Sequence, residues 1–177
     1  MINELAHYSI TSSCQAMSMG WEQPPENTHA SLVEAMNRFD GVEFDLRLTA
    51  DNQLIVHHDH RISIPIEKLE GRNKYVENWN LDDLTEIGFC SFSKLMEDKK
   101  FSIPWREHSK VACLEIKRSH PKIAKNPDNK MAEVMRQAAS IIDDAGIPET
   151  NACLLLRVTY DVFVLPFTSP SYYLTGA

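Results

Sequence analysis

The sequence lacks the features that mark a membrane-spanning, secreted or zinc-finger protein. Its 177 residues contain no apolar run near the roughly 18 residues of a membrane span. Residues 1–20 have neither the basic region nor the apolar region of a secretory signal. The four cysteines lie far apart with no CxxC pair, which excludes a cysteine-rich zinc module and gives no disulfide framework. We therefore expect a cytoplasmic protein with free thiols and no membrane span.

The chain also has fewer basic than acidic residues. The chain has 18 Lys and Arg against 25 Asp and Glu, a formal charge of −7. Such a chain is a poor general binder of nucleic-acid backbones or anionic membranes, so we expect no nucleic-acid partner. A ligand containing phosphate would need a local cluster of cations or a bound metal. With 43% hydrophobic and 24% charged residues the composition is globular, and residues 1–177 fit a single domain.

The hydrophobic pattern alternates between helices and strands. Apolar residues at helical spacing predict helices over 27–39 and 131–145, the first capped by Asn27 or Thr28. Residues 60–110 read as irregular and charged, with short helices near 81–87 and 91–98. Strands are expected over 42–49, 54–58, 111–116 and 153–158, the first with one apolar face. This order predicts an α/β fold with a mostly parallel sheet, whereas residues 159–177 form an atypical tail outside that alternation.

Polar residues gather at the ends of three of these strands. Glu43 and Asp45 are two apart on one strand, so both side chains leave the same face with Cα atoms about 6.5 Å apart. Glu115 and Lys117 repeat this arrangement on another strand, and His58 ends the strand between them. In parallel α/β folds ligands bind at the carboxyl ends of the strands, so this is where a site is expected.

Three carboxylates placed together repel one another unless they share protons or bind a cation. Oxygen ligands without cysteine suit one hard divalent ion, Mg²⁺ or Ca²⁺. His58 could act as a general acid or base, and Lys117 could neutralise an anionic oxygen. These are the parts for metal-assisted attack on a phosphodiester. Each part alone also has a plain reading: alternating charge is usual on a solvated strand, and residues 57–60 could be a surface turn or an adventitious metal site.

The order and spacing of these motifs resemble those of the glycerophosphodiester phosphodiesterase family. The resemblance runs over about 18–158. It rests on Pro25-Glu26-Asn27-Thr28 after Gly20, on Glu43-Phe44-Asp45-Leu46 followed by Leu48-Thr49-Ala50-Asp51, on Val56-His57-His58-Asp59 and on Leu114-Glu115-Ile116-Lys117. Asn52 stands where the family's turn has glycine.

The resemblance implies about the first half of a TIM (β/α) barrel, with the site at its C-terminal mouth. It also implies a metal held by Glu43, Asp45 and Glu115, a catalytic histidine at His58 and a phosphate contact from Lys117. The family splits a glycerophosphodiester into glycerol 3-phosphate and an alcohol, a reaction of lipid metabolism. Residues 60–110 match the position of the family's insertion. Trp21, beside Gly20, either lines the substrate pocket or is a core or rim aromatic residue.

Two departures from the family qualify this reading. The family's first strand ends in His-Arg-Gly, where this chain has Ser18-Met19-Gly20. Neither a hydroxyl nor a thioether exchanges protons near pH 7, and loss of a proton-transfer group typically lowers the rate about 10²–10⁴-fold. His7, His57 or His60 could substitute, although His57 should point to the opposite strand face from His58.

The second departure is length, because an eight-stranded barrel needs at least about 200 residues. A half-barrel exposes sheet edges, which predicts a homodimer or marginal stability. Three hypotheses stay open at this point. The chain is a metal-dependent phosphodiesterase, or a descendant that binds a phosphoester or a partner without turnover, or a truncated fragment without independent function.

Overall fold

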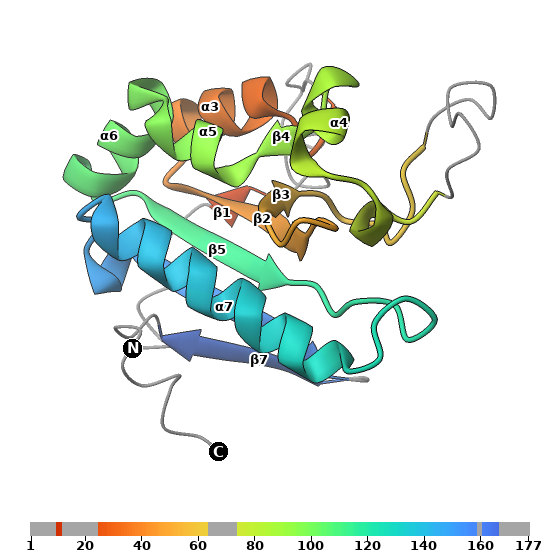
Figure 1. The fold of residues 1–177 in the computed structure, drawn as a ribbon. Helices are drawn as coiled ribbons and strands as arrows, with labels where there is room; N and C mark the ends of the chain where they lie inside the picture. The colour runs from red at the N-terminus through yellow and green to blue at the C-terminus, as the bar shows by residue number, and fades with distance from the viewer. Residues whose placement is uncertain (1–9, 12–24, 64–73, 159–160, 167–177) are drawn as a thin grey trace.

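The fold is built on a twisted sheet whose centre is parallel (Figure 1). The computed structural model describes residues 10–11, 25–63, 74–158 and 161–166. Within them the strand order is β4-β3-β2-β5-β6-β7, with β1 paired beside β2. The strands are β1 (Ile10–Thr11), β2 (Gly41–Leu48), β3 (Leu54–Val56), β4 (Cys90–Ser91), β5 (Val111–Ile116), β6 (Ala152–Val158) and β7 (Asp161–Pro166).

The parallel strands are β1, β2, β5 and β6, and the remaining strands are antiparallel additions at either side. In the register of β2 with β5, Asp45 lies opposite Glu115. This arrangement confirms the predicted α/β fold and is consistent with part of a (β/α) barrel. Part of the atypical tail forms β7, which pairs antiparallel with β6 and so does not continue the parallel series.

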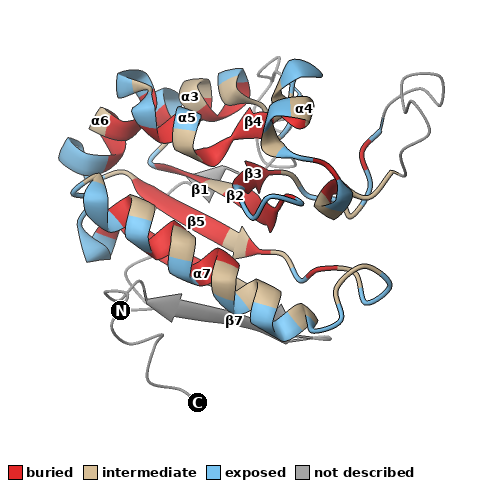
Figure 2. Cartoon of the chain, viewed as in Figure 1, coloured by how far each residue is buried: buried red, intermediate tan, exposed pale blue. Residues whose placement is uncertain are grey.

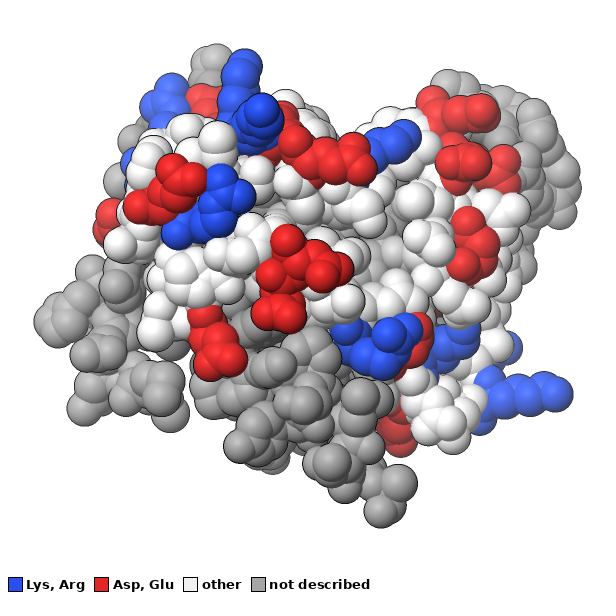
Figure 3. Space-filling view, turned by 60° about the vertical axis from the view of Figure 1, so that its left-hand side comes forward, with Lys and Arg blue, Asp and Glu red and all other residues white. Residues whose placement is uncertain are grey.

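Helices lie on both sides of this sheet, most of them on one face (Figure 1). They are α3 (His29–Arg38), α4 (Leu81–Glu86), α5 (Phe92–Glu97), α6 (Lys99–Glu107) and α7 (Pro127–Asp144), with 3₁₀ turns η2 (Val76–Asn78) and η3 (Glu149–Asn151). The buried sides of α3, α5, α6 and α7 meet one face of the sheet in the main core (Figure 2). Leu84 of α4 and Val76 of η2 instead pack with Ile55 of β3 in a second cluster on the other face. None of the described helices is long and apolar enough to cross a bilayer. On the face seen in Figure 3, acidic and basic side chains are interspersed.

The two faces of β2 have different chemistry but are both largely buried. Phe44 and Leu46 point into the helix-covered core and are fully buried there. On the opposite face Asp45 and Arg47 are only 4% exposed, and Glu43 is partly buried. The predicted strand is therefore confirmed, and its apolar residues point to one face as expected. The polar face, however, is enclosed, so the reading of a solvated sheet face is wrong.

The expectation of irregular structure over residues 60–110 is wrong in one stretch, where α6 forms around Pro104. A proline inside a helix removes the amide that would bond to the carbonyl four residues earlier. That carbonyl belongs to Lys100, and it accepts a hydrogen bond from Asn37 Nδ2 of α3 at 2.8 Å instead. Burial of Phe101 and Trp105 in the main core then holds the helix in place.

Candidate metal centre

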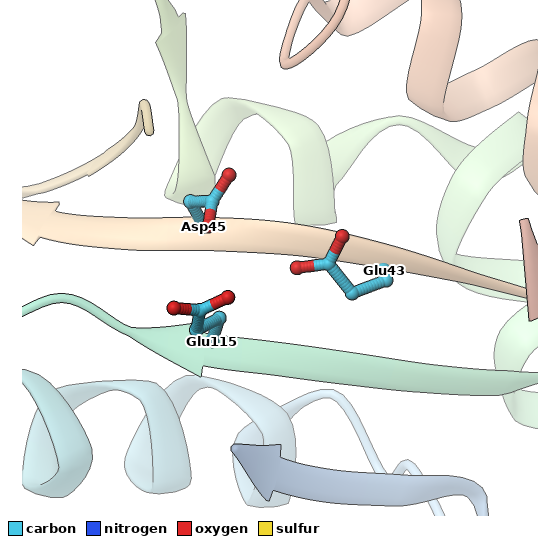
Figure 4. A group of neighbouring side chains, drawn as sticks. All are labelled: Glu43, Asp45 and Glu115. Carbon is cyan, nitrogen blue, oxygen red and sulfur yellow. The ribbon is translucent and has the colours of Figure 1, made fainter. Parts of the chain in front are cut away.

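The three predicted carboxylates meet on the sheet face opposite the main core (Figure 4). Glu43 and Asp45 occupy alternate positions of β2, and Glu115 lies opposite Asp45 on β5. One oxygen from each lies within 4.8 Å of the others. The expectation that two separate strands bring these acids together is confirmed.

Lys117 completes the cluster from the residue after β5. Its Nζ lies 2.9 Å from Asp45 Oδ1 and 2.5 Å from Glu115 Oε1, and its side chain is 11% exposed. The backbone amide of Lys117 donates to the Leu46 carbonyl, which extends the pairing of the two strands to this residue. The ammonium thus offsets part of the negative charge, and the contact with phosphate predicted for Lys117 stays a prediction.

The third carboxylate of the cluster, Glu43, has a raised pKa. Burial, together with the negative charges of Asp45 and Glu115, raises the pKa of Glu43 from 4.5 to about 7. Lys117 and His58 act in the opposite direction and are outweighed. Glu43 is therefore the acid that gains most from the arrival of a positive charge.

The donor set fits a hard divalent cation. Two oxygens bound to one Mg²⁺ or Ca²⁺ at about 2.0–2.6 Å lie no more than about 5 Å apart, which the spacing of these carboxylates satisfies. Asp45 Oδ1 is buried, and its neighbour among the described residues is the Lys117 ammonium, whose Nζ lies 2.9 Å away. A buried carboxylate oxygen that is stabilised by a neighbouring positive charge is suited to a metal ion.

Asn27 belongs to the candidate site, although its position in the sequence just before a helix predicts only a helix cap. Thr28 is the cap of α3, forming a reciprocal pair of hydrogen bonds with Ser31. Asn27 instead adopts a left-handed backbone, with φ of 56°, and its Nδ2 donates to Asp45 Oδ2 at 2.9 Å. Its amide therefore orients one of the candidate metal ligands. This left-handed backbone distinguishes Asn27 from a helix cap, and asparagine adopts it more readily than most other residues do.

His58 follows β3 and is the most exposed member of the predicted site. Its Nδ1 donates to Asp59 Oδ1 at 2.9 Å, and this bond lowers the pKa of the Asp59 carboxyl. In the neutral ring Nε2 is then the acceptor, as a general base requires. His57 is engaged elsewhere: it packs against Phe89, and its Nε2 donates to the Arg61 carbonyl.

The remaining predictions at the N-terminal side cannot be placed on the fold. Trp21 and Gly20 lie outside the described residues, as do Ser18, Met19 and His7. The roles expected of them stay predictions.

Comparison with known proteins matches this arrangement to one family. The model of the glycerophosphoryl diester phosphodiesterase family matches residues 18–154, more than half of the chain. The chain belongs to this family. A search of curated proteins found no match.

Solved structures of the family share the fold at low sequence identity. A glycerophosphodiester phosphodiesterase from Parabacteroides distasonis is 18% identical with a TM-score of 0.59, over 78% of this chain and 52% of that one. The enzyme from Thermotoga maritima is 19% identical with a TM-score of 0.50, over 77% and 49%. A phosphodiesterase from Oleispira antarctica, in complex with the product sn-glycerol-3-phosphate, is 20% identical with a TM-score of 0.53, over 76% and 52%. The chain spans about half the length of these structures.

Proposed function

We propose that the chain is a metal-dependent hydrolase that splits a glycerophosphodiester into sn-glycerol 3-phosphate and an alcohol. The observation that carries the proposal is the meeting of Glu43, Asp45 and Glu115, with oxygens within 4.8 Å of one another, on the sheet face opposite the main core in a chain of this family. Burial and the repulsion of Asp45 and Glu115 raise the pKa of Glu43 to about 7, and a bound cation would offset both effects.

Each residue has a distinct task in the proposed reaction. Glu43, Asp45 and Glu115 would hold one Mg²⁺ or Ca²⁺, which supplies Lewis-acid stabilisation of the phosphoryl oxygens. His58, with its Nδ1–H held by Asp59, presents Nε2 for proton transfer. Lys117 would turn from the carboxylates toward the substrate phosphate once a cation takes over their charge. Together, residues 1–177 would act as one domain.

One observation favours a second candidate, a binding protein that holds a phosphoester without turnover. Ser18-Met19 stands where the family has its first catalytic histidine and an arginine. If no other group transfers that proton, the rate would fall about 10²–10⁴-fold while the metal centre stayed intact. One ring nitrogen of His57 and one of His60 are engaged in hydrogen bonds, with the Arg61 carbonyl and with Arg47 respectively.

A product-release assay separates the two candidates. Glycerophosphocholine is incubated with the chain and Mg²⁺ or Ca²⁺, and glycerol 3-phosphate is measured for the parent and for Ser18→His. Turnover in the parent that is lost on chelation and in Glu115→Gln supports the hydrolase. Turnover only after Ser18→His supports the binder. Turnover that persists in Glu115→Gln contradicts the proposed metal centre. Glu86→Gln, an exposed acid on α4, is the matched control.

A further inference from the structure

Arg47 is a buried arginine that the proposed reaction leaves without a task. It follows Asp45 by two positions on β2, so it shares the face of the three carboxylates, and its side chain is only 5% exposed. Burying a guanidinium is costly unless its N–H groups find acceptors and its charge finds a partner. The hydrogen bonds and charged neighbours of Arg47 therefore indicate why it is buried.

The guanidinium holds two loops that carry site residues. Its Nε and Nη2 both donate to the backbone carbonyl of His58, at 3.1 and 2.7 Å. Its Nη1 donates to the carbonyl of Arg118, the residue after Lys117, at 3.2 Å, and to Nδ1 of His60 at 3.1 Å. Such charge-assisted bonds from a rigid fork are stronger than neutral ones and fix orientation as well as distance. Arg47 thus fastens the turn bearing His58 and the loop after Lys117 to the strand of the metal ligands.

A buried carboxylate from a distant segment holds Arg47 in turn. Glu77, on η2, is 8% exposed, and its Oε1 lies 3.5 Å from Arg47 Nη1 and 3.8 Å from His60 Nδ1. Neither oxygen of Glu77 accepts a hydrogen bond from the described residues. Its contribution is therefore charge: it offsets the guanidinium without competing for the N–H groups that hold the backbone carbonyls.

We propose that Arg47 is a positioning residue that sets His58 against the metal centre, with Glu77 holding Arg47 in place. The inference rests on the proposed hydrolase function, because it assigns the pair to placing a proton-transfer group. His58 itself is exposed, and its side-chain partner among the described residues, Asp59, lies beside it on the same turn. Within the described part of the chain, the side chain that ties this turn to β2 is Arg47, through the His58 carbonyl, next to the backbone bond from the His57 amide to the Asp45 carbonyl. A displacement of about 1 Å in a reacting group can lower a rate about 10²-fold.

The test uses Arg47→Lys, Glu77→Gln and a control, Arg136→Gln, which removes an exposed arginine paired with Glu133 on α7. Lysine keeps the charge opposite Glu77 but cannot satisfy the same set of acceptors. Amide exchange over 57–62 is measured by mass spectrometry, and kcat, KM and Mg²⁺ affinity are measured alongside it. For both site variants we expect exchange over 57–62 to rise at least about tenfold and kcat to fall about 10–100-fold. KM and Mg²⁺ affinity should stay within about threefold, since β2 and β5 still hold the ligands.

Two outcomes overturn the proposal. One is exchange over 57–62 equal to that of the parent in both site variants. The other is a loss of Mg²⁺ affinity as large as the loss of kcat, which would make Arg47 a support of the whole sheet. Absence of turnover in the parent contradicts the hydrolase instead, and the exchange measurement then decides the positioning role by itself. Arg136→Gln should match the parent in every measurement.

Discussion

Replacing Glu43 with glutamine should stabilise the cation-free protein at alkaline pH. The folded pKa of Glu43 is about 7 against 4.5 for a free side chain, so the folded state holds a proton that the unfolded state releases. Stability is therefore full below about pH 4.5 and falls as the pH rises through 7. A pKa difference of this size corresponds to about 3 kcal/mol. Because the side chain is partly exposed, screening by solvent reduces the expected gain to about 1–2 kcal/mol at pH 8.

Urea unfolding at pH 5 and pH 8 measures this gain. In EDTA the parent should lose more stability than Glu43→Gln between the two pH values, by about 1–2 kcal/mol. With Mg²⁺ or Ca²⁺ at a hundred times its dissociation constant, the parent at pH 8 should regain about 2.7 kcal/mol. The variant, which has one carboxylate fewer, should regain much less.

The control is Glu86→Gln, which makes the same chemical change at an exposed position of α4. It should follow the parent at both pH values and with the cation. The reasoning is refuted if Glu43→Gln shows the parent's pH dependence, since Glu43 would then carry no raised pKa. Equal stabilisation of parent and variant by the cation would show that Glu43 is not a ligand.

Three further predictions concern the same region of the fold. Lys117→Met removes the ammonium between Asp45 and Glu115, and should lower the cation-free stability by about 3 kcal/mol, a loss that added Mg²⁺ reverses in urea unfolding. Asn27→Gly keeps the left-handed backbone but loses the hydrogen bond to Asp45, so calorimetry should show Mg²⁺ affinity lower by about 10–100-fold. The β7 strand pairs only with β6 among the described strands, so size-exclusion chromatography should show a homodimer, and a well-folded monomer would contradict this.

The sequence was sufficient to predict the elements whose apolar pattern is strong and local. The strand over 111–116 matches β5, and the helix over 27–39 contains α3. The meeting of the three carboxylates was also predictable, because alternation along a strand fixes which side chains share a face and parallel pairing brings strand ends together. Family motifs supplied the roles that are proposed for these residues.

What the sequence did not show depends on contacts between distant segments. The α6 helix contains Pro104, and it needs Asn37 from another helix to satisfy the carbonyl that proline leaves free. The burial of Arg47 depends on Glu77, thirty residues away on η2, and no periodicity links the two. Asn27 was read as a cap because capping is the commoner use of asparagine before a helix.

The most direct test of the account is a crystal structure of the chain soaked with Mn²⁺, with data collected at the manganese edge. Mn²⁺ accepts the same carboxylate oxygens as Mg²⁺ and Ca²⁺. We predict one anomalous peak within about 2.0–2.6 Å of an oxygen from each of Glu43, Asp45 and Glu115. A peak that touches none of the three, or none at all with the carboxylates still paired to Lys117, would contradict the claim that they form a single cation site.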